Sequence, residues 1–306
     1  MTPDLLIPLL AAAVQSGTPV LYATLGEIFT ERSGVLNLGV EGIMMVGALA
    51  AFLGARISGD PAVGLLCGGL AGASLAGLHG LICIGFFGNQ VVSGLALTIL
   101  GTGLANFLGT PLVGLEAPGF SPAPFPLLGD LPFIGPIFFR HDVLVYLSYL
   151  IPPLMWAFFR YTRWGMALKA VGENPAAADA AGLSVAGFRW AGILVGGFLA
   201  GVGGSYLSLA YTHLWTTGLT AGRGWIAVAL VIFAFWRPGR AVAGAYLFGG
   251  VMAFQFRLQA GGTHIPSSLL LMLPYALTVL VLVMASWRGR GDQAPGYLGV
   301  NPDPSD

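Results

Sequence analysis

Apolar residues occur in long runs along this chain, and short polar breaks separate the runs. A membrane-spanning helix needs about 20 mostly apolar residues, because the hydrocarbon core of a bilayer is about 30 Å thick. Runs near that length lie at 5–29, 35–57, 61–87, 90–110, 143–159, 188–211, 224–236, 238–256 and 266–287. The pattern therefore predicts an all-α, polytopic transmembrane helix bundle of about nine spans, with a range of about eight to ten.

Three polar stretches define the organisation around these runs. Residues 111–142 are too rich in proline for a helix and are expected to form a loop on an aqueous face. Residues 160–189 hold four of the thirteen basic residues, including Lys169, the only lysine. The proline-rich stretch 291–306 is expected to be a disordered C-terminal tail. We therefore expect one transmembrane domain over residues 1–290.

The composition supports a membrane protein. Hydrophobic residues make up 56% of the chain and charged residues 8%, against about 25% charged residues in soluble domains. Glycine occurs 47 times without a collagen-like period. In lipid, small residues four apart let helices approach closely, and the pairs Gly68/Gly72 and Gly197/Gly201 suit that role.

The basic residues predict the orientation, because cytoplasmic loops carry an excess of Lys and Arg. If the loop 160–189 is cytoplasmic, five spans precede it and the N-terminus faces outward. The proline-rich loop 111–142 is then extracytoplasmic. The cytoplasmic side receives Arg32, Arg160, Arg163, Lys169, Arg189, Arg237, Arg240, Arg288 and Arg290, and the remaining four are Arg56, Arg140, Arg223 and Arg257.

Two charged residues are expected inside the membrane. Residues 40–49 and 222–231 share one charge, a glycine and an apolar run, which suggests inverted-repeat halves with broken helices near the midplane. Glu41 and Arg223 would then occupy matched positions of opposite sign. A membrane-embedded charge usually faces a cavity or a partner, so the two are predicted to line or brace a translocation path. The alternative places each at a helix end within reach of water.

Polar and aromatic residues near these charges are further candidates for the path. Asn37 lies beside glycine, and an unwound backbone at such depth is tolerated only where protein or a cavity satisfies it. Asn106, Phe29 and Trp225 could add amide contacts and aromatic surface. For residues such as Asn106, hydrogen bonding between helices is the alternative role.

Sequence motifs for catalysis and cofactor binding are missing. The chain has no Walker phosphate loop and no His, Cys, Asp or Glu cluster with metal-ligand spacing. Its spans also lack the several ionisable groups of a proton relay. We therefore expect no enzymatic activity, no cofactor and no bound metal on this chain, and no nucleic-acid partner.

The loop 160–189 contains a short helix signal. Asn174 can cap a helix that starts at Pro175, with Glu173 favouring its positive end, and Gly182 can terminate it. The alanines between them leave almost no side-chain bulk. Two interpretations remain open: insertion into a groove on a partner, or an ordinary connection between two spans.

Three stretches carry a family resemblance over about residues 20–287: T-R-W-G-M-A-L-K-A-V-G-E-N-P-A-A-A-D-A-A-G-L-S-V, E-R-S-G-V-L-N-L-G-V-E-G-I-M-M-V-G-A, and T-A-G-R-G-W-I-A-V-A-L-V-I-F with I-P-S-S-L-L-L-M-L-P-Y. The first resembles the cytoplasmic coupling loop of ABC importer permeases of the ribose, branched-chain amino acid and nucleoside group. The others resemble the smaller permease of nucleoside (simple sugar) uptake systems, although the chain lacks the first span of ribose-type permeases.

The resemblance implies a multi-pass transport subunit of the bacterial plasma (inner) membrane that docks on a separate ATPase. The ATPase would bind ATP-Mg, a second permease would form a heterodimer with this chain, and an extracytoplasmic lipoprotein would deliver a small-molecule substrate. The residues implied in coupling are Gly172, Glu173, Asn174, Pro175, Ala178, Asp179 and Gly182, and Asn37, Glu41 and Arg223 match motif positions near the path.

The expected substrate is a nucleoside or simple sugar, with ribose or a branched-chain amino acid as alternatives. An ion-gradient-driven secondary carrier for a small polar solute is the competing class. It predicts no ATPase partner and more charge in the spans than the sequence shows.

Overall fold

The computed structural model describes residues 3–262, 265–287 and 294–301. These residues form helices and loops, with one isolated antiparallel bridge between Glu116 and Leu214. The helical elements are α1 (Pro3–Glu31), α2 (Val40–Ser58), α3 (Pro61–Gly80), η1 (Leu81–Gly85), α4 (Gln90–Gly109), η2 (Thr110–Leu112), α5 (Ile134–Phe138), α6 (Val143–Tyr161), α7 (Arg163–Glu173), α8 (Pro175–Ala180), α9 (Val185–Tyr206), η3 (Leu207–Tyr211), α10 (Arg223–Ala234), α11 (Pro238–Ala260), α12 (Ser267–Leu271) and α13 (Leu273–Trp287).

The predicted all-α transmembrane bundle is confirmed, but a count of nine spans is not. Seven of the described helices are long and apolar enough to cross a membrane. The predicted runs 224–236 and 266–287 correspond to shorter apolar helices, Arg223–Ala234 and Leu269–Val281. Twelve residues of α10 extend for only about 18 Å, less than the thickness of the hydrocarbon core.

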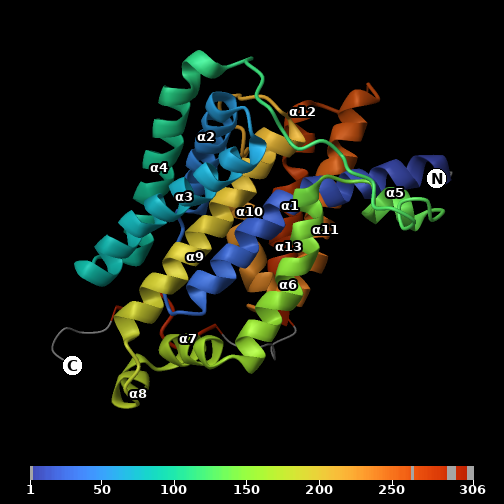
Figure 1. The fold of residues 1–306 in the computed structure, drawn as a ribbon. Helices are drawn as coiled ribbons and strands as arrows, with labels where there is room; N and C mark the ends of the chain where they lie inside the picture. Colours follow the sequence, from blue (N-terminus) through green and yellow to red (C-terminus); the bar gives the residue numbers. More distant parts are fainter. Residues whose placement is uncertain (1–2, 263–264, 288–293, 302–306) are drawn as a thin grey trace.

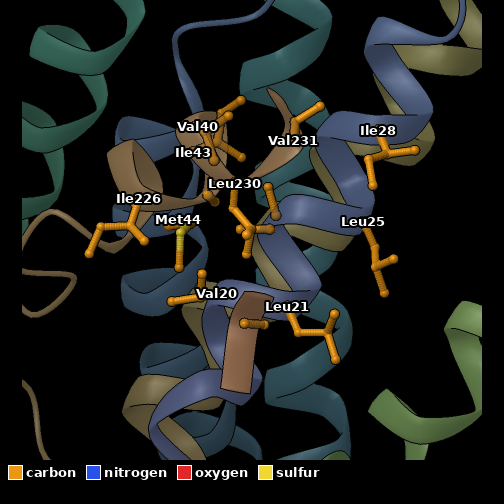
Figure 2. Close-up of a cluster of buried hydrophobic side chains, with 14 of the residues drawn as sticks. Val20, Leu21, Leu25, Ile28, Val40, Ile43, Met44, Ile226, Leu230 and Val231 are labelled. Carbon is orange, nitrogen blue, oxygen red and sulfur yellow. The ribbon is translucent and has the colours of Figure 1, made fainter. Parts of the chain in front are cut away.

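The first helix runs through the centre of the bundle (Figure 1). It packs on α9, α11 and α10, and its buried side chains meet those of α2 and α10. Figure 2 shows part of this core, formed by Val20, Leu21, Leu25, Ile28, Val40, Ile43, Met44, Ile226, Leu230 and Val231. Segments far apart in the sequence therefore share one apolar core, and the starts of α2 and α10 lie together in it.

Glycines allow α3 to lie directly against its neighbours, as the spacing of small residues predicts. A Cβ at Gly72 would lie 2.5 Å from the carbonyl oxygen of Gly197, and one at Gly68 would lie 2.6 Å from that of Gly47. A Cβ at Gly47 would in turn lie 2.6 Å from Gly201 Cα. Larger side chains at these positions would force the three helices α2, α3 and α9 apart.

Several helices are interrupted, in agreement with the predicted broken helices. The π-helical turns η1 and η3 continue α3 and α9, and such turns are frequent at functional sites. Residues 32–39, before α2, and 212–222, before α10, are not helical. Whether the two halves form an inverted repeat stays a prediction.

The helices α7 and α8 lie at one end of the bundle, which we call the coupling face (Figure 1). The C-terminal end of α1 reaches this face, because a Cβ at Gly172 would lie 3.0 Å from the backbone nitrogen of Gly34. The irregular loop that follows α4 lies at the opposite end, where Arg56 donates a hydrogen bond to the Glu116 carbonyl. Five long helices precede α7, so the N-terminal end of α1 and α7 lie on opposite sides.

Candidate translocation path and coupling region

Glu41 caps the N-terminus of α10 with its carboxylate. Its Oε1 accepts hydrogen bonds from the backbone nitrogen of Gly222 at 2.8 Å and from Thr220 Oγ1 at 2.5 Å. Its Oε2 accepts from the backbone nitrogen of Gly224 at 2.6 Å. The first N–H groups of a helix have no partner within the helix, and the helix dipole favours a negative charge there. Since the N-cap residue of α10 is a glycine, Glu41 supplies the missing cap from another helix.

Arg223 is buried beside this cap but does not form an ion pair with Glu41. Its Nη1 donates to the carbonyl oxygens of Thr220 at 3.1 Å and Leu219 at 3.4 Å. Its guanidinium carbon lies 5.7 Å from the centre of the Tyr211 ring. Among the described residues the ion pair within 4.0 Å is Arg140 with Asp130. Glu41 and Arg223 therefore lie together at the start of α10, but each binds backbone groups and not the other, and Arg223 Nε is buried without a hydrogen-bond partner.

Asn37 organises the unwound segment that leads into α2. Its Oδ1 accepts from the backbone nitrogen of Gly39 at 2.9 Å, and its own backbone nitrogen donates to Glu27 Oε1 at 3.1 Å. The neighbouring Leu36 donates its N–H to Gln90 Oε1 at 2.7 Å. The unwound backbone is therefore satisfied by protein groups, which is one of the two conditions expected for such a segment.

The other predicted path residues lie in two separate places. Asn106 on α4 accepts a hydrogen bond from the backbone nitrogen of Gly218, in the segment before α10. Trp225 is on α10 and is 38% exposed. Phe29, in contrast, stacks on Phe158 with ring centres 5.4 Å apart. It lines an apolar cavity of about 460 Å³ between α1, α6, α7 and α9. The structure therefore does not gather the six predicted residues around one cavity.

A second set of buried ionisable residues, near the coupling face, was not among the predicted site residues. Glu27 and Glu31 are each 2% exposed, and Glu31 Oε2 accepts a hydrogen bond from Trp236 Nε1 at 2.5 Å. Arg189 is also 2% exposed. Two carboxyl residues four apart share one face of a helix, so this spacing within the first apolar run was the signal that could have revealed the pair.

The short helix predicted in the loop 160–189 is present as α8. Asn174 Oδ1 accepts from the backbone nitrogen of Ala177 at 3.0 Å, and Pro175 takes the first helical position. Gly182 ends the helix with a φ of +82°, a conformation that favours glycine. Ala178 is buried while Asp179 is exposed. The helix lies at the coupling face (Figure 1), and its exposed residues are alanines and Asp179.

The C-terminal tail differs from the predicted disordered segment over residues 294–301, which we call the C-terminal clasp. The backbone nitrogen of Tyr297 donates to the Gly172 carbonyl at 3.0 Å, and that of Gly296 donates to Glu173 Oε2 at 3.1 Å. Asn301 Nδ2 donates to the Gly88 carbonyl at 2.7 Å. Hydrogen bonds to the end of α7 and to the segment between η1 and α4 hold this stretch on the bundle. Arg288, Arg290 and residues 291–293 and 302–306 lie outside the described residues.

The arrangement defines a class of protein: a multi-pass membrane permease that presents a capped helix at one face. The family model for the branched-chain amino acid transport system / permease component matches residues 9–282. The chain belongs to this family, and it is an ABC transporter permease in the plasma membrane.

Relatives of known name are similar over most of their length. The chain is 47% identical to the "Putative glucose ABC transporter permease protein TsgC13" of Haloferax volcanii, over 82% of this chain and 78% of that protein. It is 35% identical to the "Nucleoside ABC transporter permease protein NupC" of Lactococcus lactis, over 91% and 92% of the two chains. It is 34% identical to the "Guanosine ABC transporter permease protein NupQ" of Bacillus subtilis, over 94% of each.

A solved structure shares the fold. The protein titled "An inward-facing conformation of a putative metal-chelate type ABC transporter" superimposes with a TM-score of 0.52 and 16% identity. The match covers 90% of this chain and 85% of the other. At this identity the similarity supports the helical architecture of an ABC permease.

Proposed function

We propose that this chain forms the translocation path of an ATP-binding-cassette importer for a nucleoside or a simple sugar. The observation that carries the proposal is α8, a capped helix of small residues that is exposed at the coupling face. A helix with little side-chain bulk fits closely into a groove on a partner. Its attachment through α7 to α6, and directly to α9, transmits a displacement of the partner to the spans.

Coupling is assigned to residues 172–182 of the coupling face. Gly172 lies against the segment after α1, and Pro175 and Ala178 face inward. Glu173, Asn174, Asp179 and Gly182 are exposed to a partner. Inward-facing residues hold the helix on the bundle, so a motion of the docked ATPase moves α7 and α9 with it.

The substrate class follows from chemistry common to the relatives. Their names specify glucose, nucleoside and guanosine, which are hydroxylated solutes that require hydrogen-bonding groups. Asn106 lies on α4, and the partly exposed Trp225 lies on α10. The segment before α10 meets both helices, and its Gly218 donates a hydrogen bond to Asn106. An indole can stack on a nucleobase or a sugar face. Glu41 and Arg223 stabilise the start of α10, the helix on which Trp225 lies.

The proposal includes the orientation, the partners and the absence of enzymatic activity. The basic residues at the coupling face make it cytoplasmic, and the loop after α4 is then extracytoplasmic. The partners are ATPase subunits that bind ATP-Mg, a second permease that forms a heterodimer with this chain, and an external substrate-binding lipoprotein. This chain itself has no catalytic residue and no cofactor, and among its described residues no group of acidic, His or Cys side chains could hold a metal ion.

Purification from native membranes, with co-purifying proteins identified by mass spectrometry, tests the assembly. We expect an ATPase, a second permease and a lipoprotein. Uptake of labelled guanosine, glucose and leucine into cells with and without the chain then tests the substrate class. Loss of guanosine or glucose uptake supports the proposal, and loss of leucine uptake alone contradicts it. Transport by the chain alone in ATP-free liposomes would replace the importer with a secondary carrier.

A further inference from the structure

A cavity with five basic side chains opens at the coupling face, away from α8. Its volume is about 630 Å³, and it lies between the end of α1, α6, α7 and the α10–α11 junction. The basic residues that line it are Arg32, Arg160, Lys169, Arg237 and Arg240, and none of the lining residues is acidic. These residues come from separate parts of the chain, so the cavity arises only on folding. We call it the basic cavity.

The lining of the basic cavity has the charge of an anion site, because five of its residues are basic and none is acidic. Among the described residues, Arg160 and Lys169 form no hydrogen bond and no ion pair. Arg32 donates to the Trp236 carbonyl at 3.3 Å, and Arg240 lies over the Phe235 ring with 5.1 Å to its centre. Like charges brought together repel each other, and a bound anion removes this repulsion.

The position of the basic cavity indicates that the anion belongs to a lipid. Arg160 is in the last turn of α6, a candidate span that ends at Tyr161. Trp156 lines the cavity and is 53% exposed, and Tyr161 and Trp164 near it are also exposed. Aromatic side chains gather where a bilayer meets water, at the level of the headgroups. The basic side chains therefore lie where a phosphate headgroup is found.

We propose that the basic cavity binds the headgroup of an anionic phospholipid in the cytoplasmic leaflet. Basic pockets between transmembrane helices on the cytoplasmic side are suited to such headgroups. The lipid would connect α1, α6, α7 and the α10–α11 junction, and α7 continues to the coupling helix α8. The assignment to the cytoplasmic leaflet depends on the orientation given under Proposed function.

The test measures lipid retention on the chain purified with the subunits that accompany it. Native mass spectrometry after exchange into nanodiscs of phosphatidylglycerol and phosphatidylcholine reports which lipid stays bound. The double variant Lys169→Gln/Arg240→Gln should retain about 25-fold less phosphatidylglycerol, at about fivefold for each charge removed. Arg163→Gln, which removes an exposed charge on α7 outside the cavity, should retain as much as the wild type.

Two further measurements decide the outcome. Lys169→Arg keeps the charge and should retain as much phosphatidylglycerol as the wild type. A loss of lipid in this variant would indicate a structural defect and overturn the assignment. Displacement of the lipid by inorganic phosphate would indicate a soluble-anion site, and equal retention of phosphatidylcholine would also contradict the proposal. Because retention is measured without ATP or solute, the result does not depend on whether the chain imports a nucleoside or sugar.

Discussion

Glu41 Oε2 accepts the backbone N–H of Gly224 at 2.6 Å, and this contact joins the start of α2 to the start of α10. The contact connects two segments that are about 180 residues apart. A carboxylate at this place replaces the cap that α10 lacks, so the two helices form one rigid unit. Several predictions about stability and transport depend on this unit.

Replacement of Glu41 by Gln should destabilise the protein by about 1–2 kcal/mol, because the amide removes the charge and turns an N–H₂ group toward backbone N–H donors. Thermal unfolding in detergent, followed by the loss of the monodisperse chromatographic peak, measures the change. Glu116→Gln is the control, because Arg56 donates its hydrogen bond to the backbone carbonyl of Glu116, and this bond does not involve the side chain that is changed. An unchanged midpoint in Glu41→Gln would show that the cap is unimportant.

Exchange of the two charges, Glu41→Arg with Arg223→Glu, should not restore transport lost in either single variant. The partners of Glu41 are backbone N–H groups. A guanidinium at that place would put its own hydrogen-bond donors against these N–H donors, and neither side could accept. Substrate uptake by the two single variants and the double variant measures the effect. Recovery in the double variant would support a direct charge pair between the two side chains, which the structure does not contain.

Replacement of Gly224 by Ala should cost about 1–3 kcal/mol, because the new methyl group would lie 2.5 Å from Glu41 Cα and the backbone would have to move. Gly239→Ala is the matched control, since no atom lies within 4 Å of a Cβ there. Both glycines are in the first turn of a helix. Equal stability of the two variants, measured by thermal unfolding, would contradict the close contact of the helix starts.

Reversal of the charge at Asp179 should uncouple ATP hydrolysis from uptake while the permease stays folded. Asp179 is exposed on α8, where a lysine or arginine would repel or misalign an ATPase groove, and uptake should fall about tenfold. Uptake and ATPase activity of Asp179→Arg in the assembled complex are compared. The control Glu116→Arg changes an exposed carboxylate in the loop after α4, at the other end of the bundle, which forms no ion pair with the described residues. Normal uptake in Asp179→Arg would refute the docking assignment.

Truncation before residue 294 should loosen the coupling face. The C-terminal clasp donates to the carbonyls of Gly34 and Gly172 and accepts from Arg189 through the carbonyl of Val300. Hydrogen exchange in residues 32–39 and 172–183 should become faster, and uptake should fall. Truncation after Asn301 keeps every one of these bonds and should behave as the wild type. Identical exchange in the two truncations would instead support the initial prediction of a disordered tail.

The local features that the sequence predicted depend on neighbouring residues. Asn174, Pro175 and Gly182 specify the start and end of α8 within nine residues, so the local sequence was enough to predict this helix. The apolar runs that gave the long spans are equally local, because length and hydropathy decide whether a segment crosses a bilayer. The cap of α10 was not readable in this way, because Glu41 on another helix binds its first backbone N–H groups.

The sequence by itself determined the all-helical membrane fold, the position of the short helix α8 and the small residues that bring helices together. Only the tertiary structure decided that Glu41 caps α10 without pairing with Arg223, and that Phe29 lies apart from the other candidate path residues. It also decided that the C-terminal clasp is ordered and that five cations converge on one cavity. These features depend on contacts between distant segments, whose partners are chosen by packing, whereas spans and caps depend on residues within a few turns.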